Sequence, residues 1–93
     1  MRVISNWSLV EFAERHPEVH VALQMWRKTI EAGSFSNFAA LRRAFNATDR
    51  VGDFYVFDIG GNKFRLIAAV HFTVQKLYVR HVLTHKEYDK WKP

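Results

Sequence analysis

Two arginines, Arg65 and Arg80, are placed to act together on one anionic group. They lie in two segments, 63–72 and 76–83, in which alternate residues are mostly apolar, as in half-buried strands. If the apolar sets of neighbouring antiparallel strands pack together, both guanidinium groups should emerge on the opposite, open face of the sheet. Two guanidinium groups on that face could clamp one phosphate through bidentate hydrogen bonds.

The same faces of these segments carry two lysines. Lys63 shares its side of the first segment with Arg65, and Lys76 shares its side of the second with Arg80. Basic side chains are common on the solvent face of an antiparallel sheet, and either arginine could instead pair with a carboxylate. Candidate partners for such ion pairs are Asp53, Asp58 and Glu87. Phosphate binding and simple ion pairing are therefore both open for the two arginines.

His85 is the side chain best suited to move a proton near neutral pH. It follows Thr84, where a strand is expected to pass into a short helix and a side chain can project into a groove. Its neutral imidazole can take a proton, and its cation can return one. Tyr88, three residues later on the same helical side, could stack on a base or bind a phosphate. The alternative makes His85 a surface residue and Tyr88 the core anchor of its helix.

The other histidines do not form a recognisable metal site. His16 and His20 have an i, i+4 spacing that can bind a metal, but Pro17 follows His16 directly and no third ligand is evident. His81 falls on the apolar side of its segment and is expected as a buried, hydrogen-bonded imidazole. The chain has no cysteine, which excludes disulfides, thiolate metal sites and a cysteine nucleophile. Neither a metal nor a cofactor is expected.

The composition predicts a small basic domain with its own core. The chain has 93 residues, and its 48% of hydrophobic residues suffices for one domain over 1–93. The net charge of +5 fits a polyanionic partner or an acidic protein equally well. The sequence shows no leader peptide at its start and no apolar stretch long enough to span a membrane. A cytoplasmic protein without a membrane association is therefore expected.

The elements that must position these residues divide into a helical first half and a strand-rich second half, as in α+β domains. His16-Pro17 separates two helices, because the residue before proline disfavours helical geometry. Gly60-Gly61-Asn62 is the strongest turn signal and predicts a hairpin. The predicted strands cover 1–4, 54–59, 63–72 and 76–83, and the predicted helices cover 8–15, 17–32, 38–45 and 86–91.

The last predicted helix has a clear start signal. Thr84 can cap it, and Glu87, three residues later, completes the spacing of a capping box. The expected α+β fold is a small antiparallel sheet with the N-terminal helices packed on one face and a short C-terminal helix.

The second half of the chain resembles the HigB branch of the RelE/ParE toxin superfamily. The resemblance is carried by three motifs in order: Tyr55-Val56-Phe57-Asp58-Ile59-Gly60-Gly61-Asn62-Lys63-Phe64-Arg65-Leu66-Ile67-Ala68, then Tyr78-Val79-Arg80, then Thr84-His85-Lys86-Glu87-Tyr88-Asp89. The helical half is similar to the family's usual opening but would not identify it alone. The resemblance implies a single RelE-like toxin domain over residues 1–93.

The resemblance also implies an activity. Such toxins are endoribonucleases that cleave messenger RNA, commonly on translating ribosomes, and a HigA-type antitoxin with a helix-turn-helix domain holds them inactive. The implied mechanism needs no metal: the RNA 2′-hydroxyl attacks the adjacent phosphate and releases a 5′-hydroxyl end. By this resemblance Arg65 and Arg80 would stabilise charge and His85 would carry a proton. Lys63, Tyr88 and Lys76 would bind substrate.

Two other functions are compatible with the same residues. A non-catalytic basic module that binds RNA or a protein needs the cationic face but does not need His85. ParE-like members of the superfamily inhibit gyrase, which would stop replication before translation.

Overall fold

The computed structural model describes residues 1–5, 8–61 and 63–93, and its elements follow the predicted order. The strands are β1 (Arg2–Ile4), β2 (Asp49–Val51), β3 (Phe54–Ile59), β4 (Phe64–His71) and β5 (Lys76–Thr84). The helices are α1 (Ser8–Arg15), α2 (His20–Ala32), α3 (Phe38–Ala44) and α4 (His85–Lys90), with a 3-10 turn at Pro17–Val19. The predicted α+β class is confirmed. The short β2 was not predicted.

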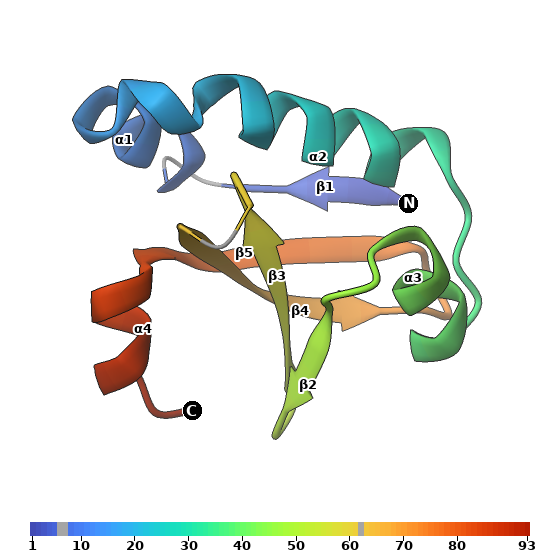
Figure 1. The fold of residues 1–93 in the computed structure, drawn as a ribbon. Helices are drawn as coiled ribbons and strands as arrows, with labels where there is room; N and C mark the ends of the chain where they lie inside the picture. The colour runs from blue at the N-terminus through green and yellow to red at the C-terminus, as the bar shows by residue number, and fades with distance from the viewer. Residues whose placement is uncertain (6–7, 62) are drawn as a thin grey trace.

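The strands form one sheet in the order β1-β5-β4-β3-β2 (Figure 1). The antiparallel meander β3-β4-β5 is as predicted, but β1 joins its edge parallel to β5, with Val3 opposite Leu77. The prediction of a purely antiparallel sheet was therefore wrong. A parallel pair needs a long crossover connection, and the segment containing α1 and α2 provides part of one here. No helix in the described part of the chain is both long and apolar enough to cross a membrane.

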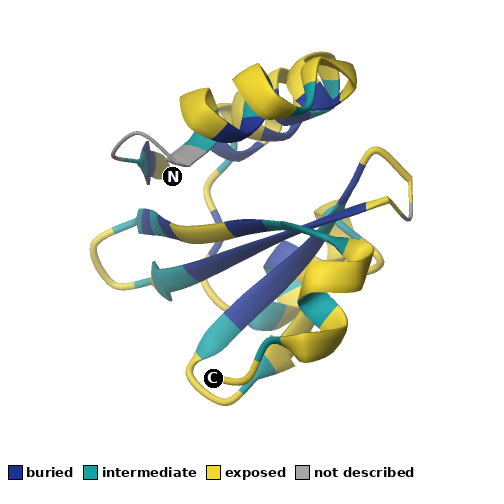
Figure 2. Cartoon of the chain, turned by 90° about the vertical axis from the view of Figure 1, so that its left-hand side faces the viewer, coloured by how far each residue is buried: buried dark blue, intermediate teal, exposed yellow. Residues whose placement is uncertain are grey.

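The first three helices cover one face of the sheet. The apolar stripe predicted along the second helix is buried, with Leu23 and Trp26 each 4% exposed and Ile30 fully buried. The Trp26 ring meets the Phe57 ring edge-on at 5.4 Å between centroids. Figure 2 shows that the outer sides of the helices are exposed while the central strands are buried. This face holds the main core.

The last helix, α4, packs on the opposite face of the sheet, below the strands in Figure 1. Trp91, which ends it, contacts the rings of Phe54 and His81 at 5.8 and 6.4 Å between centroids. Val56 and Ile67, paired across β3 and β4, are buried on this second face. The expectation that helices pack on one face holds only for the N-terminal ones, since a second, smaller apolar layer lies under α4.

A β-bulge in β5 changes which residues face the main core. Ala68 pairs with Val79 but Ile67 pairs with His81, so Arg80 is an extra residue in the ladder. Beyond a one-residue bulge the alternation of faces is reversed. Val82 therefore enters the core at 7% exposure, and His81 is exposed on the other face. The prediction that His81 is a core imidazole was wrong for this reason.

The hairpin between β3 and β4 sets the register of the candidate site. Gly60 and Gly61 have φ angles of 65° and 73°, which glycine adopts without steric cost. The third residue of the predicted turn, Asn62, lies outside the described residues. This turn places Asp58 directly opposite Arg65.

Candidate active site

Arg65 is held between the sheet and α4. Its Nε lies 3.0 Å from Asp58 Oδ1, and its guanidinium carbon lies 5.7 Å from the centroid of the Tyr88 ring. A terminal nitrogen also donates to the carbonyl oxygen of Phe64 at 3.2 Å. The residue is only 9% exposed. The prediction that Arg65 emerges on an open face was wrong, because α4 covers that face, and the alternative of a pair with Asp58 is confirmed.

Arg80 is exposed and contacts a different ring. Its guanidinium carbon lies 5.3 Å from the centroid of Tyr78, which pairs with Ala69. The Arg65 guanidinium, by contrast, lies over the ring of Tyr88 in α4. The two guanidinium groups therefore lie over separate rings and do not form the predicted clamp on one phosphate. The bulge and the pair with Asp58 account for the difference.

His85 begins α4, one residue earlier than predicted. Its backbone is held by the capping box of α4 and by a hydrogen bond to Lys63, the residue before β4. The predicted capping box is confirmed: Glu87 N–H donates to Thr84 Oγ1 at 3.1 Å, and Thr84 N–H donates to Glu87 Oε1 at 2.9 Å. His85 N–H donates to the carbonyl oxygen of Lys63 at 3.0 Å. The imidazole itself is exposed, and its Nδ1 lies 3.6 Å from Asp89 Oδ1. A fixed backbone with an exposed ring suits a proton carrier.

The pKa of Glu87 is lowered below its usual value. The largest cause is the hydrogen bond from the Thr84 backbone N–H, and the Thr84 hydroxyl and the charges of Arg15 and His16 act in the same direction. Desolvation opposes this shift. The carboxylate that completes the cap is therefore ionised at neutral pH and holds the turn that presents His85.

The remaining candidates lie at different distances from His85. Lys63 is exposed and is bonded to His85 through the backbone, and Tyr88 is half-buried and stacks on Trp91 at 6.0 Å between centroids. Lys76 is opposite His71 at the other end of β5, eight residues from Thr84, or about 26 Å along a strand. The structure thus groups Lys63, Arg65, His85 and Tyr88, and leaves Lys76 far from them.

Asp58 and Trp91 belong to the same cluster but were not chosen from the sequence. Asp58 was considered only as an ion-pair partner, although counting outward from the glycine turn places it opposite Arg65. Trp91 packs on Tyr88 and Phe54, and no local pattern signals that role.

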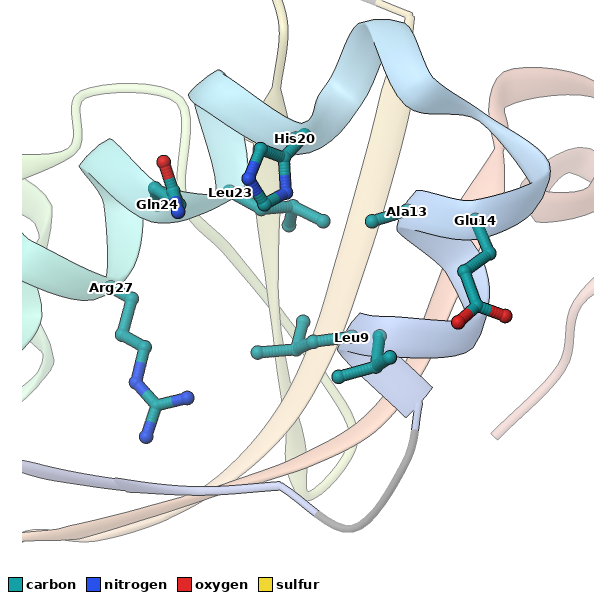
Figure 3. Close-up of a pocket in the computed structure, with 8 residues that line it drawn as sticks. Leu9, Ala13, Glu14, His20, Leu23, Gln24 and Arg27 are labelled. Carbon is teal, nitrogen blue, oxygen red and sulfur yellow. The ribbon is translucent and has the colours of Figure 1, made fainter.

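A pocket lies elsewhere, between α1 and α2 (Figure 3). Its volume is about 440 Å³, and its walls are mostly apolar. It is lined by Leu9, Val10, Ala13, Glu14, His20, Leu23, Gln24 and Arg27. Three or more metal-ligating side chains do not come together anywhere in the described residues. None of the candidate site residues lines this pocket.

The fold is that of a small α+β domain with basic side chains at one end of its sheet, and comparison with known families gives its class. A family model described as HigB_toxin, the RelE-like toxic component of a toxin–antitoxin system, matches residues 19–91. The chain therefore belongs to the HigB toxin family.

Several relatives match along nearly the whole chain. The mRNA interferase toxin HigB of Escherichia coli strain K12 is 38% identical over 92 residues, which cover 96% of this chain and 88% of the relative. The mRNA interferase HigB of Shigella flexneri matches equally well. That of Escherichia coli O6:H1 is 34% identical over 97% of this chain and 90% of its own.

Proposed function

We propose that this protein is an mRNA interferase, an endoribonuclease toxin that cleaves messenger RNA and inhibits translation. The observation that carries the proposal is 38% identity over 96% of the chain to a relative named as an mRNA interferase toxin. Membership of a toxin–antitoxin family adds an antitoxin that holds the activity in check. We propose a HigA-type antitoxin with a helix-turn-helix domain. We also propose that the protein cuts free RNA by itself and that its substrate in the cell is mRNA on translating ribosomes.

The cleavage step we propose uses the RNA's own nucleophile. The 2′-oxygen attacks the adjacent phosphorus, the bond from phosphorus to the 5′-oxygen breaks, and the products are a 2′,3′-cyclic phosphate and a 5′-hydroxyl. One proton must leave the 2′-hydroxyl and one must reach the 5′-oxygen. His85 is the candidate carrier for one of them, since its ring is exposed and its Nδ1 faces Asp89, which leaves Nε2 for the substrate. The mechanism is proposed to need no metal.

The cations have separate parts in this proposal. Arg65 lies next to Tyr88 and near the start of α4, where it stabilises negative charge on the reacting phosphate. Lys63 and Tyr88 contact the same stretch of RNA. Arg80 and Lys76 follow along β5, so they bind parts of the strand further from the cleaved bond.

Induced expression in bacteria tests the activity. Primer extension on cellular transcripts should map new 5′ ends within coding regions soon after induction, and protein synthesis should fall before DNA synthesis in pulse labelling. An early stop of DNA synthesis with intact transcripts would contradict the proposal and indicate gyrase inhibition. Growth arrest that persists in a His85→Gln variant, without new RNA ends, would indicate a non-catalytic binding module.

A further inference from the structure

A guanidinium and an imidazole at the end of α1 have no part in the mechanism above. Arg15, the last residue of α1, is exposed, and its guanidinium carbon lies 5.7 Å from the centroid of the Phe12 ring. His16 follows it and is half-buried, with its ring centroid 4.5 Å from that of Phe12 and 5.6 Å from that of Phe64. These ring contacts fix the corner formed by Arg15 and His16 against the first residue of β4.

This corner lies beside the start of α4. Phe64, which His16 contacts, pairs with Thr84 across β4 and β5, and Thr84 caps α4. The residue before Phe64 is Lys63, whose carbonyl oxygen accepts the backbone N–H of His85. Figure 1 shows α1 and α4 at the same end of the sheet, on opposite sides of it. The corner and the candidate proton carrier are therefore anchored to the same end of β4.

Charges of both signs surround the corner. The pKa of Glu87, in the first turn of α4, is lowered mainly by its hydrogen bonds with Thr84. Arg15 and His16 add smaller electrostatic effects in the same direction, which places both side chains within reach of that helix. Glu18 offsets part of the charge, since its Oε1 lies 3.6 Å from His16 Nδ1. Arg15, by contrast, presents its guanidinium to solvent beside an aromatic ring.

We propose that Arg15 and His16 form a second phosphate-binding subsite, which holds a phosphate of the RNA strand next to the one cleaved at His85. This inference rests on the proposed function, because it supposes an RNA substrate. A strand that crosses the end of the sheet from α4 towards α1 passes His85 and Lys63 and then reaches the corner. The guanidinium of Arg15 can bind a phosphate through two hydrogen bonds.

A flanking phosphate does not change during the reaction, so its binding is the same in the ground state and the transition state. The subsite should therefore act on KM and on RNA affinity and leave kcat unchanged. A purely structural role of the corner would instead change the stability of the protein and leave the salt dependence of RNA binding as it was.

The test uses Arg15→Gln, His16→Phe and a matched control, Arg43→Gln. The phenylalanine keeps the ring contacts with Phe12 and Phe64 while removing the nitrogens, and Arg43 is an exposed arginine of α3, towards the other end of the sheet. Affinity for a single-stranded RNA oligonucleotide is measured over a range of salt concentrations in a His85→Gln background, and KM and kcat are measured in the active protein. Arg15→Gln should weaken binding by about three- to fivefold at low salt. It should also make the slope of log affinity against log salt shallower by about 0.7.

Arg15→Gln should raise KM, and His16→Phe should raise it by a smaller factor. Arg43→Gln should match the parent. If the parent cleaves RNA while both corner variants match the control in slope and KM, the subsite is wrong and the proposed function stands. If the parent binds RNA with a slope that Arg15→Gln reduces but cleaves nothing, the subsite is supported and the proposed activity fails. If the parent binds no RNA, both are overturned.

Discussion

Arg65 illustrates how one residue can serve both stability and chemistry. It is almost fully buried, pairs with Asp58 and lies over Tyr88, so its position is fixed before any substrate arrives. A fixed guanidinium needs no reorganisation when charge develops beside it. The pair with Asp58 offsets part of its charge, so we expect Arg65 to act on the phosphate as a fixed, partly neutralised cation.

Replacing Arg65 by alanine should therefore lower both activity and stability. Cleavage should fall by about 10²- to 10³-fold, by analogy with the loss of one oxyanion-hole donor. Asp58 would be left partly buried without its partner, so the free energy of unfolding should fall by about 1 to 3 kcal/mol in chemical denaturation. Asp58→Asn removes the same pair and is the control: an equal loss of activity in Asp58→Asn would assign Arg65 a structural role only.

Arg80 should behave differently, because it is exposed at the bulge and contacts only the Tyr78 ring among the interactions described for its side chain. Arg80→Ala should leave the denaturation midpoint almost unchanged and reduce RNA affinity in a salt-dependent way. Titration of a labelled RNA at two salt concentrations measures this. Undiminished affinity at low salt would remove Arg80 from the substrate path.

At the scale of elements, α4 connects the cap at Thr84 with the aromatic cover formed by Tyr88 and Trp91. The helix has only six residues, too few to be stable alone, so the capping box and the packing of its rings hold it on the sheet. If α4 frays, His85 loses its orientation and Arg65 loses its cover.

The cap makes part of the stability depend on pH. Since folding lowers the pKa of Glu87 below 4.5, the ionised carboxylate stabilises the folded state above that pH, and this stability is lost as the pH falls through the lowered value. Glu87→Gln should therefore destabilise the protein near neutral pH and have little effect in strong acid. Chemical denaturation at several pH values measures this, and an equal loss at every pH would contradict it.

These elements were predictable to different degrees. The hairpin, α2 and the cap of α4 follow from short-range signals: Gly60-Gly61, the apolar stripe ending at Ile30, and Thr84 with Glu87. The parallel pairing of β1 with β5 joins distant segments, and no local pattern specifies such a partner. The bulge was not predicted, because side chains were assumed to alternate between the two faces of the sheet throughout β5, including Arg80. Val79 and Val82 are both buried in the same core although they are three residues apart, which a regular strand does not allow.

The spatial grouping of the candidate residues was predicted only in part. Lys63, Arg65, His85 and Tyr88 do lie at one end of the sheet, because the hairpin and the cap position them. The convergence of Arg65 with Arg80 failed, because the sequence does not reveal that α4 covers the second face.

At the scale of the whole molecule, charge is divided unevenly. Residues 8–32, which form the α1 and α2 layer, carry three basic and four acidic side chains, while the rest of the chain carries eleven basic and five acidic ones. An RNA strand is therefore attracted more strongly to the rest of the molecule than to this layer, with Arg15 in the less basic layer. The apolar pocket between α1 and α2 lies within the less basic region.

A cleavage reaction that uses only the side chains of this surface should not depend on a divalent metal. Cleavage of a short RNA by the purified protein should proceed at the same rate in excess EDTA, with salt held constant because salt alone weakens RNA binding. Loss of activity in EDTA, with recovery on adding magnesium or zinc, would contradict the metal-independent mechanism.

The most direct test of the account is end-group analysis of RNA cut by the purified protein, with the parent compared with His85→Gln. The parent should produce 5′-hydroxyl and 2′,3′-cyclic phosphate ends, and His85→Gln should bind the same RNA with similar affinity but cleave it about 10²- to 10⁴-fold more slowly. Products with 5′-phosphate ends, or an unchanged rate in His85→Gln, would contradict the proposed chemistry at the start of α4.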